Sequence, residues 1–221
     1  MLKLIIGNRA YSSWSMRGWL AVKQSGEPFE ELVVPMFDAE WEQRREGDEF
    51  APSLGKVPIM WDGECVVWDS LAIIEFLADR VGRERFWPED AAARGMARSM
   101  AAEMHSSFAN LRRELPVNVR KSYPPRALSN GVKDDINRIL QLWAQARARF
   151  GGTGDFLFGD WCAADIMYTP VVTRFITYGV AVPPFAELYM KAVLSHPHVQ
   201  DWIDQAQDEP WVIEQYEDAA A

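Results

Sequence analysis

The hydrophobic pattern changes once along the chain, near residue 82, and this change constrains the fold more than any other feature. Before it, short apolar runs typical of strands alternate with stretches of helical periodicity. Strands are predicted at residues 2–6 and 29–34, with a helix between them that begins near Ser12 and stops at Gly26. A hairpin over residues 57–68, with Asp62 and Gly63 as its turn, leads into a helix over 70–81. This order indicates an α/β unit.

After residue 82 no further strand-like alternation is found. Residues 83–90, which include Trp87 and Pro88, predict a linker. Helices are predicted over about 88–119, over about 132–150, from near Cys162, and over 185–195 and 197–206. We therefore expect a fold of the class α/β plus all-α, with a first domain over 1–82, a linker over 83–90 and an all-helical domain over 91–221.

Charge and composition argue against several classes of function. The 23 Lys and Arg against 32 Asp and Glu give a net charge of −9, and nucleic-acid binding needs a concentrated basic surface instead. No apolar run approaches the ~20 residues of a membrane span, and the stretch after Lys3 is too short for a secretory signal. Cys65 and Cys162 lie far apart and outside any metal-ligand spacing. We expect free thiols, a buried and inert Cys65, no metal site, no membrane or nucleic-acid partner, and a cytoplasmic location.

Three features of the first unit could carry chemistry. Residues 11–17 place several hydroxyls where a strand leads into a helix, whose free N–H groups and dipole stabilise an anion or a thiolate. Pro58 opens a strand, and a cis Pro58 would leave the backbone of Val57 free to pair with an extended ligand. Asp69 and Ser70 open a helix and suit an ammonium and a carboxylate. Taken singly, each feature is explained as well by helix capping or by an edge proline.

In combination these motifs resemble the glutathione S-transferases. The matching stretches are residues 12–17 (SSWSMR), 55–60 (GKVPIM) and 69–77 (DSLAIIEFL). Residues 159–165 (GDWCAAD), in the helical half, are similar to a helix-start motif of the same family, so the resemblance covers nearly the whole chain. Its serine-bearing first motif is most similar to the zeta-type branch, which includes the maleylacetoacetate isomerases.

The resemblance implies a thioredoxin-like first domain that binds reduced glutathione at its edge. Ser12 would donate a hydrogen bond to the glutathione sulfur and hold it as a thiolate, assisted by the dipole of the helix that follows. Val57 would pair its backbone with the cysteinyl part of glutathione, beside a cis Pro58. Asp69 and Ser70 would hold the ammonium and carboxylate of the γ-glutamyl end.

Ser13 and Lys56 complete the implied glutathione site, with Lys56 near the glycyl carboxylate. Ser13, Ser15 and Tyr11 remain open as alternatives for the contact with the sulfur. We prefer Ser12 to Tyr11 because the tyrosine used by other transferase classes sits closer to the end of the first strand.

The chain departs from the zeta-type pattern at three positions. Trp14 stands where those enzymes have cysteine, which argues against isomerase activity and puts a bulky indole beside the proposed sulfur site. Cys162 stands where the family usually has a capping Ser or Thr, so we expect Asp165 to carry more of the helix cap. Asp69 stands where Glu or Gln is common.

A second-substrate site is expected beside the sulfur, formed by Tyr11, Trp14, His105 and Arg112. Arg98, His105 and Arg112 recur every seven residues of the helix predicted over 88–119 and would share one face of it. That face is either a cationic wall that attracts an acidic electrophile or an ordinary solvated or interface face.

These observations predict a cytoplasmic, homodimeric glutathione transferase that joins the glutathione thiolate to small electrophiles. Two alternatives stay open. One is a glutathione-dependent isomerase that regenerates glutathione in each cycle, and the other is a non-catalytic regulatory protein that binds glutathione.

Overall fold

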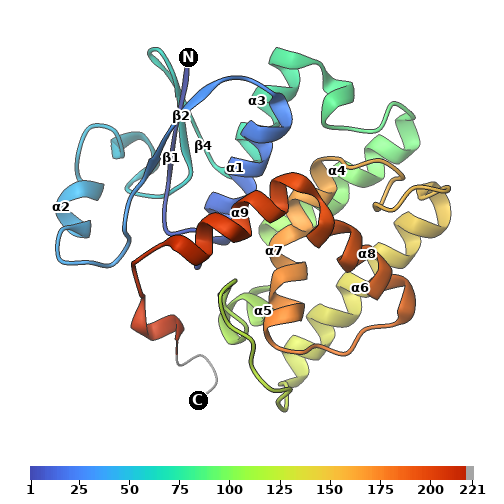
Figure 1. Ribbon diagram of the computed structural model, residues 1–221. Helices are drawn as coiled ribbons and strands as arrows, with labels where there is room; N and C mark the ends of the chain where they lie inside the picture. Colours follow the sequence, from blue (N-terminus) through green and yellow to red (C-terminus); the bar gives the residue numbers. More distant parts are fainter. Residues whose placement is uncertain (218–221) are drawn as a thin grey trace.

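A computed structural model describes residues 1–217, and its first part is the expected α/β unit (Figure 1). The strands are β1 (Leu2–Ile6), β2 (Phe29–Val33), β3 (Ile59–Asp62) and β4 (Cys65–Trp68), and the helices are α1 (Ser13–Ser25), α2 (Trp41–Arg45) and α3 (Ser70–Val81). The last four residues of the expected helical domain, 218–221, lie outside the described residues.

The four strands form one mixed sheet in the order β2-β1-β3-β4. Strand β2 runs parallel to β1, whereas β3 runs antiparallel to both β1 and β4. The turn of the β3–β4 hairpin falls at Gly63 and Glu64, one residue later than predicted, because Asp62 still pairs with Cys65 as the last rung. Gly63 takes a positive φ of 61°, which suits a residue without a Cβ.

The expectation of a buried Cys65 is wrong. Cys65 is exposed, whereas Cys162 is buried, and both are free thiols. The reason is topological, since β4 is the edge strand of the sheet and Cys65 follows its turn directly.

Alternation along β1 divides the core of the α/β unit between the two faces of the sheet. Leu2, Leu4 and Ile6 pack into the large core that includes α1 and α3. Ile5, which points to the opposite face, packs with Trp41 and Phe50 of the segment around α2. The acidic stretch 37–50 is thus anchored by Trp41 and Phe50.

The rest of the described chain is helical and lies against the α1 and α3 side of the sheet (Figure 1). Its helices are α4 (Ala91–Ser106), α5 (Ala109–Glu114), α6 (Asn130–Phe150), α7 (Ala163–Thr177), α8 (Pro184–Ser195) and α9 (Pro197–Asp208). Helix α7 is central, and every residue of it except Ile176 is buried. Asp165 caps it by accepting the backbone N–H of Cys162 at 2.9 Å and that of Leu157 at 3.2 Å.

A continuous helix over 88–119 is not formed. Helix α4 ends at Ser106, and Phe108 adopts a left-handed conformation with φ of 62° before α5 begins. The Arg112 guanidinium bonds the carbonyls of Met104, His105 and Ser107, which the end of α4 leaves without helical partners. Arg112 therefore lies on a different helix from His105 and caps the one that precedes it.

The two halves share one hydrophobic core. It includes Leu4 and Trp19 from the first half and Met100, Trp143 and Trp202 from the second. In the segment 83–90 a 3₁₀ helix spans Arg83–Arg85, and Phe86 and Trp87 are buried. Within residues 1–217, no helix combines the length and apolarity needed to cross a membrane.

Candidate functional site

A cavity of about 920 Å³ lies where the first domain meets the helices. One wall is built from the start of α1, the segment 52–58 and the start of α3, and the other from α4, α5, the segment after α5 and α7. Every site residue predicted from the sequence lines it: Tyr11, Ser12, Ser13, Trp14, Lys56, Val57, Pro58, Asp69, Ser70, His105 and Arg112. Their individual roles remain predictions.

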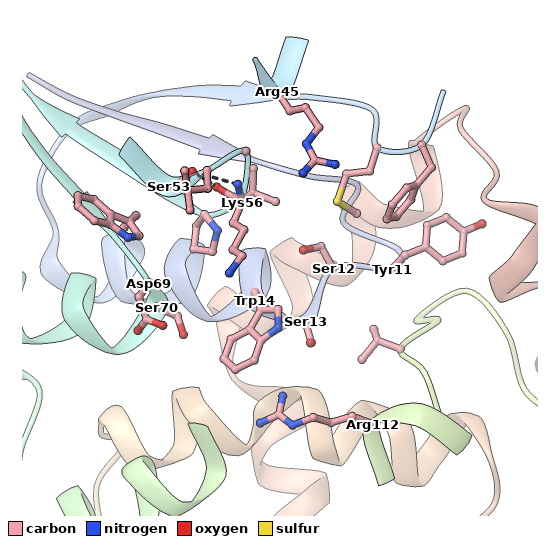
Figure 2. A pocket seen from close by; sticks show the side chains of 18 of the residues that line it. Tyr11, Ser12, Ser13, Trp14, Arg45, Ser53, Lys56, Asp69, Ser70 and Arg112 are labelled. Atoms are coloured by element: carbon pink, nitrogen blue, oxygen red, sulfur yellow. Dashed lines mark hydrogen bonds between the residues drawn. The ribbon is translucent and has the colours of Figure 1, made fainter. Parts of the chain in front are cut away.

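Helix α1 points its N-terminus at the centre of the cavity (Figure 2). Ser12 is its N-cap and accepts the backbone N–H of Ser15 at 3.2 Å. The Ser12 hydroxyl also donates to the Ser15 hydroxyl at 2.8 Å. Ser13, at the first position of the helix, lies with its Oγ 3.5 Å from a guanidinium nitrogen of Arg174.

The two other candidates for the sulfur contact have different partners. The Tyr11 hydroxyl donates to Glu217 at 2.6 Å and accepts from Arg120 at 2.6 Å, and in Figure 2 it points away from Ser12. Burial and the Glu217 carboxylate raise the pKa of Tyr11. Ser15 is fully buried, does not line the cavity and accepts the N–H of Gly7 at 2.9 Å.

The Val57–Pro58 peptide bond is cis, as the resemblance implied. Within the described residues, neither the N–H nor the C=O of Val57 forms a backbone hydrogen bond, because β3 begins only at Ile59. Ser53 fixes this segment, since its hydroxyl donates to the Lys56 carbonyl at 2.7 Å and accepts the Lys56 N–H at 3.0 Å. Figure 2 shows the Lys56 side chain extending into the space between Ser12 and Ser70, with Arg45 above it.

Asp69 and Ser70 lie at the start of α3 on the same wall (Figure 2). Asp69 caps the helix by accepting the N–H of Leu71 at 2.8 Å, and it holds an unusual backbone with φ of 76°. Its second carboxylate oxygen lies 2.5 Å from Nε2 of His105. The Ser70 hydroxyl is buried at the cavity and has no hydrogen-bond partner among the described residues.

Trp14 faces the second wall, which carries arginines rather than carboxylates. The guanidinium carbons of Arg17 and Arg112 lie 4.8 Å and 4.7 Å from the centre of the Trp14 ring. The His105 ring meets Trp14 edge-on at 5.3 Å. Arg98 takes no part, because it pairs with Glu75 at 3.2 Å and does not line the cavity.

Sequence reasoning missed several residues of the cavity. Arg45 and Arg174 both line it, and Arg17 lies beneath Trp14 without reaching its surface. A signal existed for Arg174, which is a single charge in the apolar run 166–176. Arg45 carries no comparable signal, since it lies in a polar stretch.

Comparisons with known proteins agree with this geometry. Residues 11–80 match the family model described as glutathione S-transferase, N-terminal domain. The chain is 23% identical over 212 residues to the glutathione S-transferase GstB of Escherichia coli strain K12, an alignment that covers 90% of this chain and 94% of the relative. The comparisons support the glutathione S-transferase family.

Solved glutathione S-transferases also share the fold. A glutathione transferase homolog from Burkholderia GL BGR1 with bound glutathione superposes with a TM-score of 0.70 at 22% identity, covering 94% of this chain and 99% of that one. Isozyme E7 from Drosophila melanogaster gives 0.69 at 18% identity and covers 99% and 95%. The thioredoxin-like first domain and the helical second domain are thereby confirmed. The zeta-type branch stays a prediction, because none of these relatives is described as zeta-type.

Proposed function

We propose that this protein is a glutathione transferase that joins the sulfur of glutathione to small electrophiles. The observation that carries the proposal is one cavity wall with three open binding groups: the α1 N-terminus with two serines, the unpaired Val57 backbone and the unpartnered Ser70 hydroxyl. Each can bind a different part of a γ-glutamyl tripeptide. We place the protein in the cytoplasm, as a homodimer, by analogy with the family that it resembles.

The γ-glutamyl end fits the start of α3. A buried hydroxyl without a partner costs about 1–3 kcal/mol, so a carboxylate that accepts a hydrogen bond from Ser70 would remove a deficit of the free protein. The helix dipole favours the same charge. Asp69 would receive the ammonium through the carboxylate oxygen that now contacts His105.

The middle and the glycyl end of glutathione fit the next segment along the wall. The cysteinyl N–H and C=O would pair with the open backbone of Val57 as a short added strand. Lys56 and Arg45 bring positive charge to the same side of the cavity. Either cation can bind the glycyl carboxylate.

The thiolate would form at the N-terminus of α1. The Ser15 N–H is occupied by Ser12, but the N–H groups of Ser13 and Trp14 donate no hydrogen bond within residues 1–217 and lie at the positive end of the helix. Rotation of the Ser12 hydroxyl away from Ser15 would aim its proton at the sulfur. The thiol then loses its proton to solvent, sulfur attacks the electrophilic carbon, and the leaving group departs with its bonding pair.

Single alanine variants of the two serines test the thiolate step. Ser12→Ala should raise the thiol pKa of bound glutathione by about one unit, the equivalent of one net hydrogen bond. It should also lower kcat/KM about tenfold at pH 6.5, and the loss of the cap should reduce the unfolding free energy by about 1 kcal/mol. Titration of the thiolate absorbance measures the first effect, and thermal melting measures the last.

Ser13→Ala is the matched control. The Ser13 hydroxyl neighbours that of Ser12 and lines the same cavity, but it does not cap α1. It should leave the thiol pKa within a few tenths of a unit. The larger pKa effect in Ser13→Ala would transfer the role to Ser13. Bound glutathione with an unshifted thiol pKa in both variants would rule out the serine mechanism, and no glutathione binding by wild type would rule out the function.

A further inference from the structure

Three arginines that we call the arginine cluster gather around Trp14 and Ser13: Arg17, Arg112 and Arg174. They come from α1, α5 and α7, and Arg112 and Arg174 line the cavity. Arg17 is fully buried beneath Trp14, and both of its terminal nitrogens lack a hydrogen-bond partner among residues 1–217. Arg174 is also buried, with 4% of its surface exposed.

No member of the cluster forms an ion pair with a carboxylate among residues 1–217. Their hydrogen bonds go to neutral oxygens. Arg17 donates to the Met167 carbonyl at 2.9 Å, and Arg174 donates to the carbonyls of Leu115 at 2.8 Å and Pro170 at 3.2 Å. Buried charges are normally paired, so the cluster lacks a counter-charge.

Electrostatics within the cluster point the same way. Burial, followed by the charges of Arg112 and Arg174, holds the pKa of Arg17 well below its ordinary value. Burial and the Arg112 charge lower the pKa of Arg174 to about 9, and burial lowers that of Arg112. Three like charges in one poorly hydrated place repel one another. An anion between them would reduce both this repulsion and the cost of burying the charges.

We propose that the arginine cluster binds an anionic group, a carboxylate in the simplest case, on the second substrate of this enzyme. Arg112 and Arg174 would contact it directly, because a guanidinium binds a carboxylate with paired hydrogen bonds, and Arg17 would add charge from beneath. Trp14, Phe37 and Val117 offer apolar surface in the same cavity. The substrate class is therefore an electrophile with an apolar body and a negative group.

This inference rests on the proposed function, since it takes glutathione to occupy the first wall. The carboxylates of glutathione itself already have partners there, namely Ser70 at one end and Lys56 or Arg45 at the other. Ser13 lies next to Arg174, so the anion would be bound beside the reacting sulfur rather than in place of glutathione.

A matched pair of chloroarenes tests the preference in the wild-type protein. In both 4-chloro-3,5-dinitrobenzoate and its neutral amide, sulfur attacks the carbon that bears chlorine, a C–S bond forms and chloride leaves with the electron pair of the C–Cl bond. We expect kcat/KM, divided by the uncatalysed rate constant, to be at least about tenfold higher for the carboxylate, as one charge-assisted hydrogen bond predicts. Equal values for the two probes would overturn the proposal.

Arg112→Gln and Arg174→Gln should each lower that preference about tenfold or more, because the amide keeps hydrogen-bond donors but removes the charge. Arg113→Gln is the matched control, as Arg113 is adjacent in sequence but exposed and outside the cavity, and it should stay within twofold of wild type. Circular dichroism checks folding. If Arg174→Gln fails to fold, the proposal is tested by Arg112→Gln and by the ratio of the two kcat/KM values in wild type.

Two binding measurements separate this proposal from the proposed function. Calorimetry of wild type with glutathione alone tests the first wall, and calorimetry with the benzoate and the amide, without glutathione, tests the cluster. Benzoate binding without glutathione binding would reject the function but keep the anion site. Glutathione binding with no preference for the benzoate over the amide would keep the proposed function but reject the anion site. A third outcome would also overturn the anion site. If the arginine variants lose kcat/KM equally for both probes and raise the thiol pKa of bound glutathione, the cluster stabilises the thiolate instead.

Discussion

Ser12 and Ser70 lie at the starts of two helices in the same cavity, yet their hydroxyls are in opposite states. Ser12 is the N-cap of α1 and both accepts and donates a hydrogen bond within the protein. Ser70 follows the N-cap Asp69, so the capping bonds are made by that carboxylate and the serine hydroxyl is left without a partner in the described part of the chain. The first hydroxyl stabilises the free protein, whereas the second is open to a ligand.

Ser70→Ala should therefore separate binding from stability. Removal of an unsatisfied buried hydroxyl should leave the unfolding free energy of the free protein unchanged, or raise it by up to about 1 kcal/mol. The Kd for glutathione should rise about tenfold, since the carboxylate loses its donor. Calorimetry and thermal melting measure the two effects.

Ser99→Ala is a suitable control, because Ser99 is exposed on α4 and its hydroxyl bonds only a backbone carbonyl of its own helix. It should change neither quantity. A Ser70→Ala protein that melts earlier but binds glutathione normally would make Ser70 a structural residue.

Among the secondary-structure elements, the residues at helix ends determine where each helix starts and stops. Capping residues in the sequence located several helix starts, including Asp69 before α3 and Asp165 within α7. It missed the break between α4 and α5, because apolar residues keep their helical spacing across it and Phe108 gives no local signal for a left-handed backbone. Tertiary packing, with Phe108 buried and Arg112 folded back onto α4, determines that break.

Helix α9 begins at a histidine cap that should make its stability depend on pH. His196 accepts the backbone N–H of His198 through Nδ1 at 3.3 Å and stacks on Trp161 at 4.0 Å. Burial and the nearby His198 charge lower the pKa of His196 to about 4, against an ordinary value of 6.5. Protonation of Nδ1 would remove the acceptor and leave the helix uncapped.

The unfolded chain binds this proton near pH 6.5, whereas the folded chain resists it down to about pH 4. Stability is therefore lost as pH falls through this window. We expect the melting temperature of wild type to drop more steeply between pH 6.5 and 4 than that of His196→Asn, which keeps a capping side chain that does not titrate there. Parallel pH profiles of the two proteins would contradict this role of His196.

In the molecule as a whole, contacts between distant parts of the chain close one end of the cavity. Arg120 donates to the carbonyls of Glu209 and Trp211, each at 2.8 Å, and to the Tyr11 hydroxyl. Glu217 accepts from the same hydroxyl. The segment 209–217 is thus fastened to the loop between β1 and α1 and brings Tyr216 to the cavity.

Arg120→Gln should loosen this segment. We expect faster proteolysis within residues 209–217, measured by mass spectrometry, because the loss of two charge-assisted bonds weakens the attachment. We also expect the KM for the second substrate to change at least about twofold. The KM for glutathione should not change, since Lys56 and Ser70 lie on the other side of Ser12 from Tyr11 (Figure 2). Exposed Arg83→Gln should match wild type in all three measurements, and equal proteolysis of both variants would refute the fastening role of Arg120.

The sequence by itself determined the strands, most of the helices and the residues of the wall that we propose for glutathione, because period-two and helical spacing, capping residues and the Val57-Pro58 pair act over a few neighbouring residues. Only the tertiary structure decided which hydroxyls are free, that Cys65 lies on an edge strand, and that Arg17, Arg112 and Arg174 gather around Trp14 and Ser13. Arg17 and Arg174 are more than 150 positions apart. Their meeting depends on how α1, α5 and α7 pack together, and no local pattern encodes that packing.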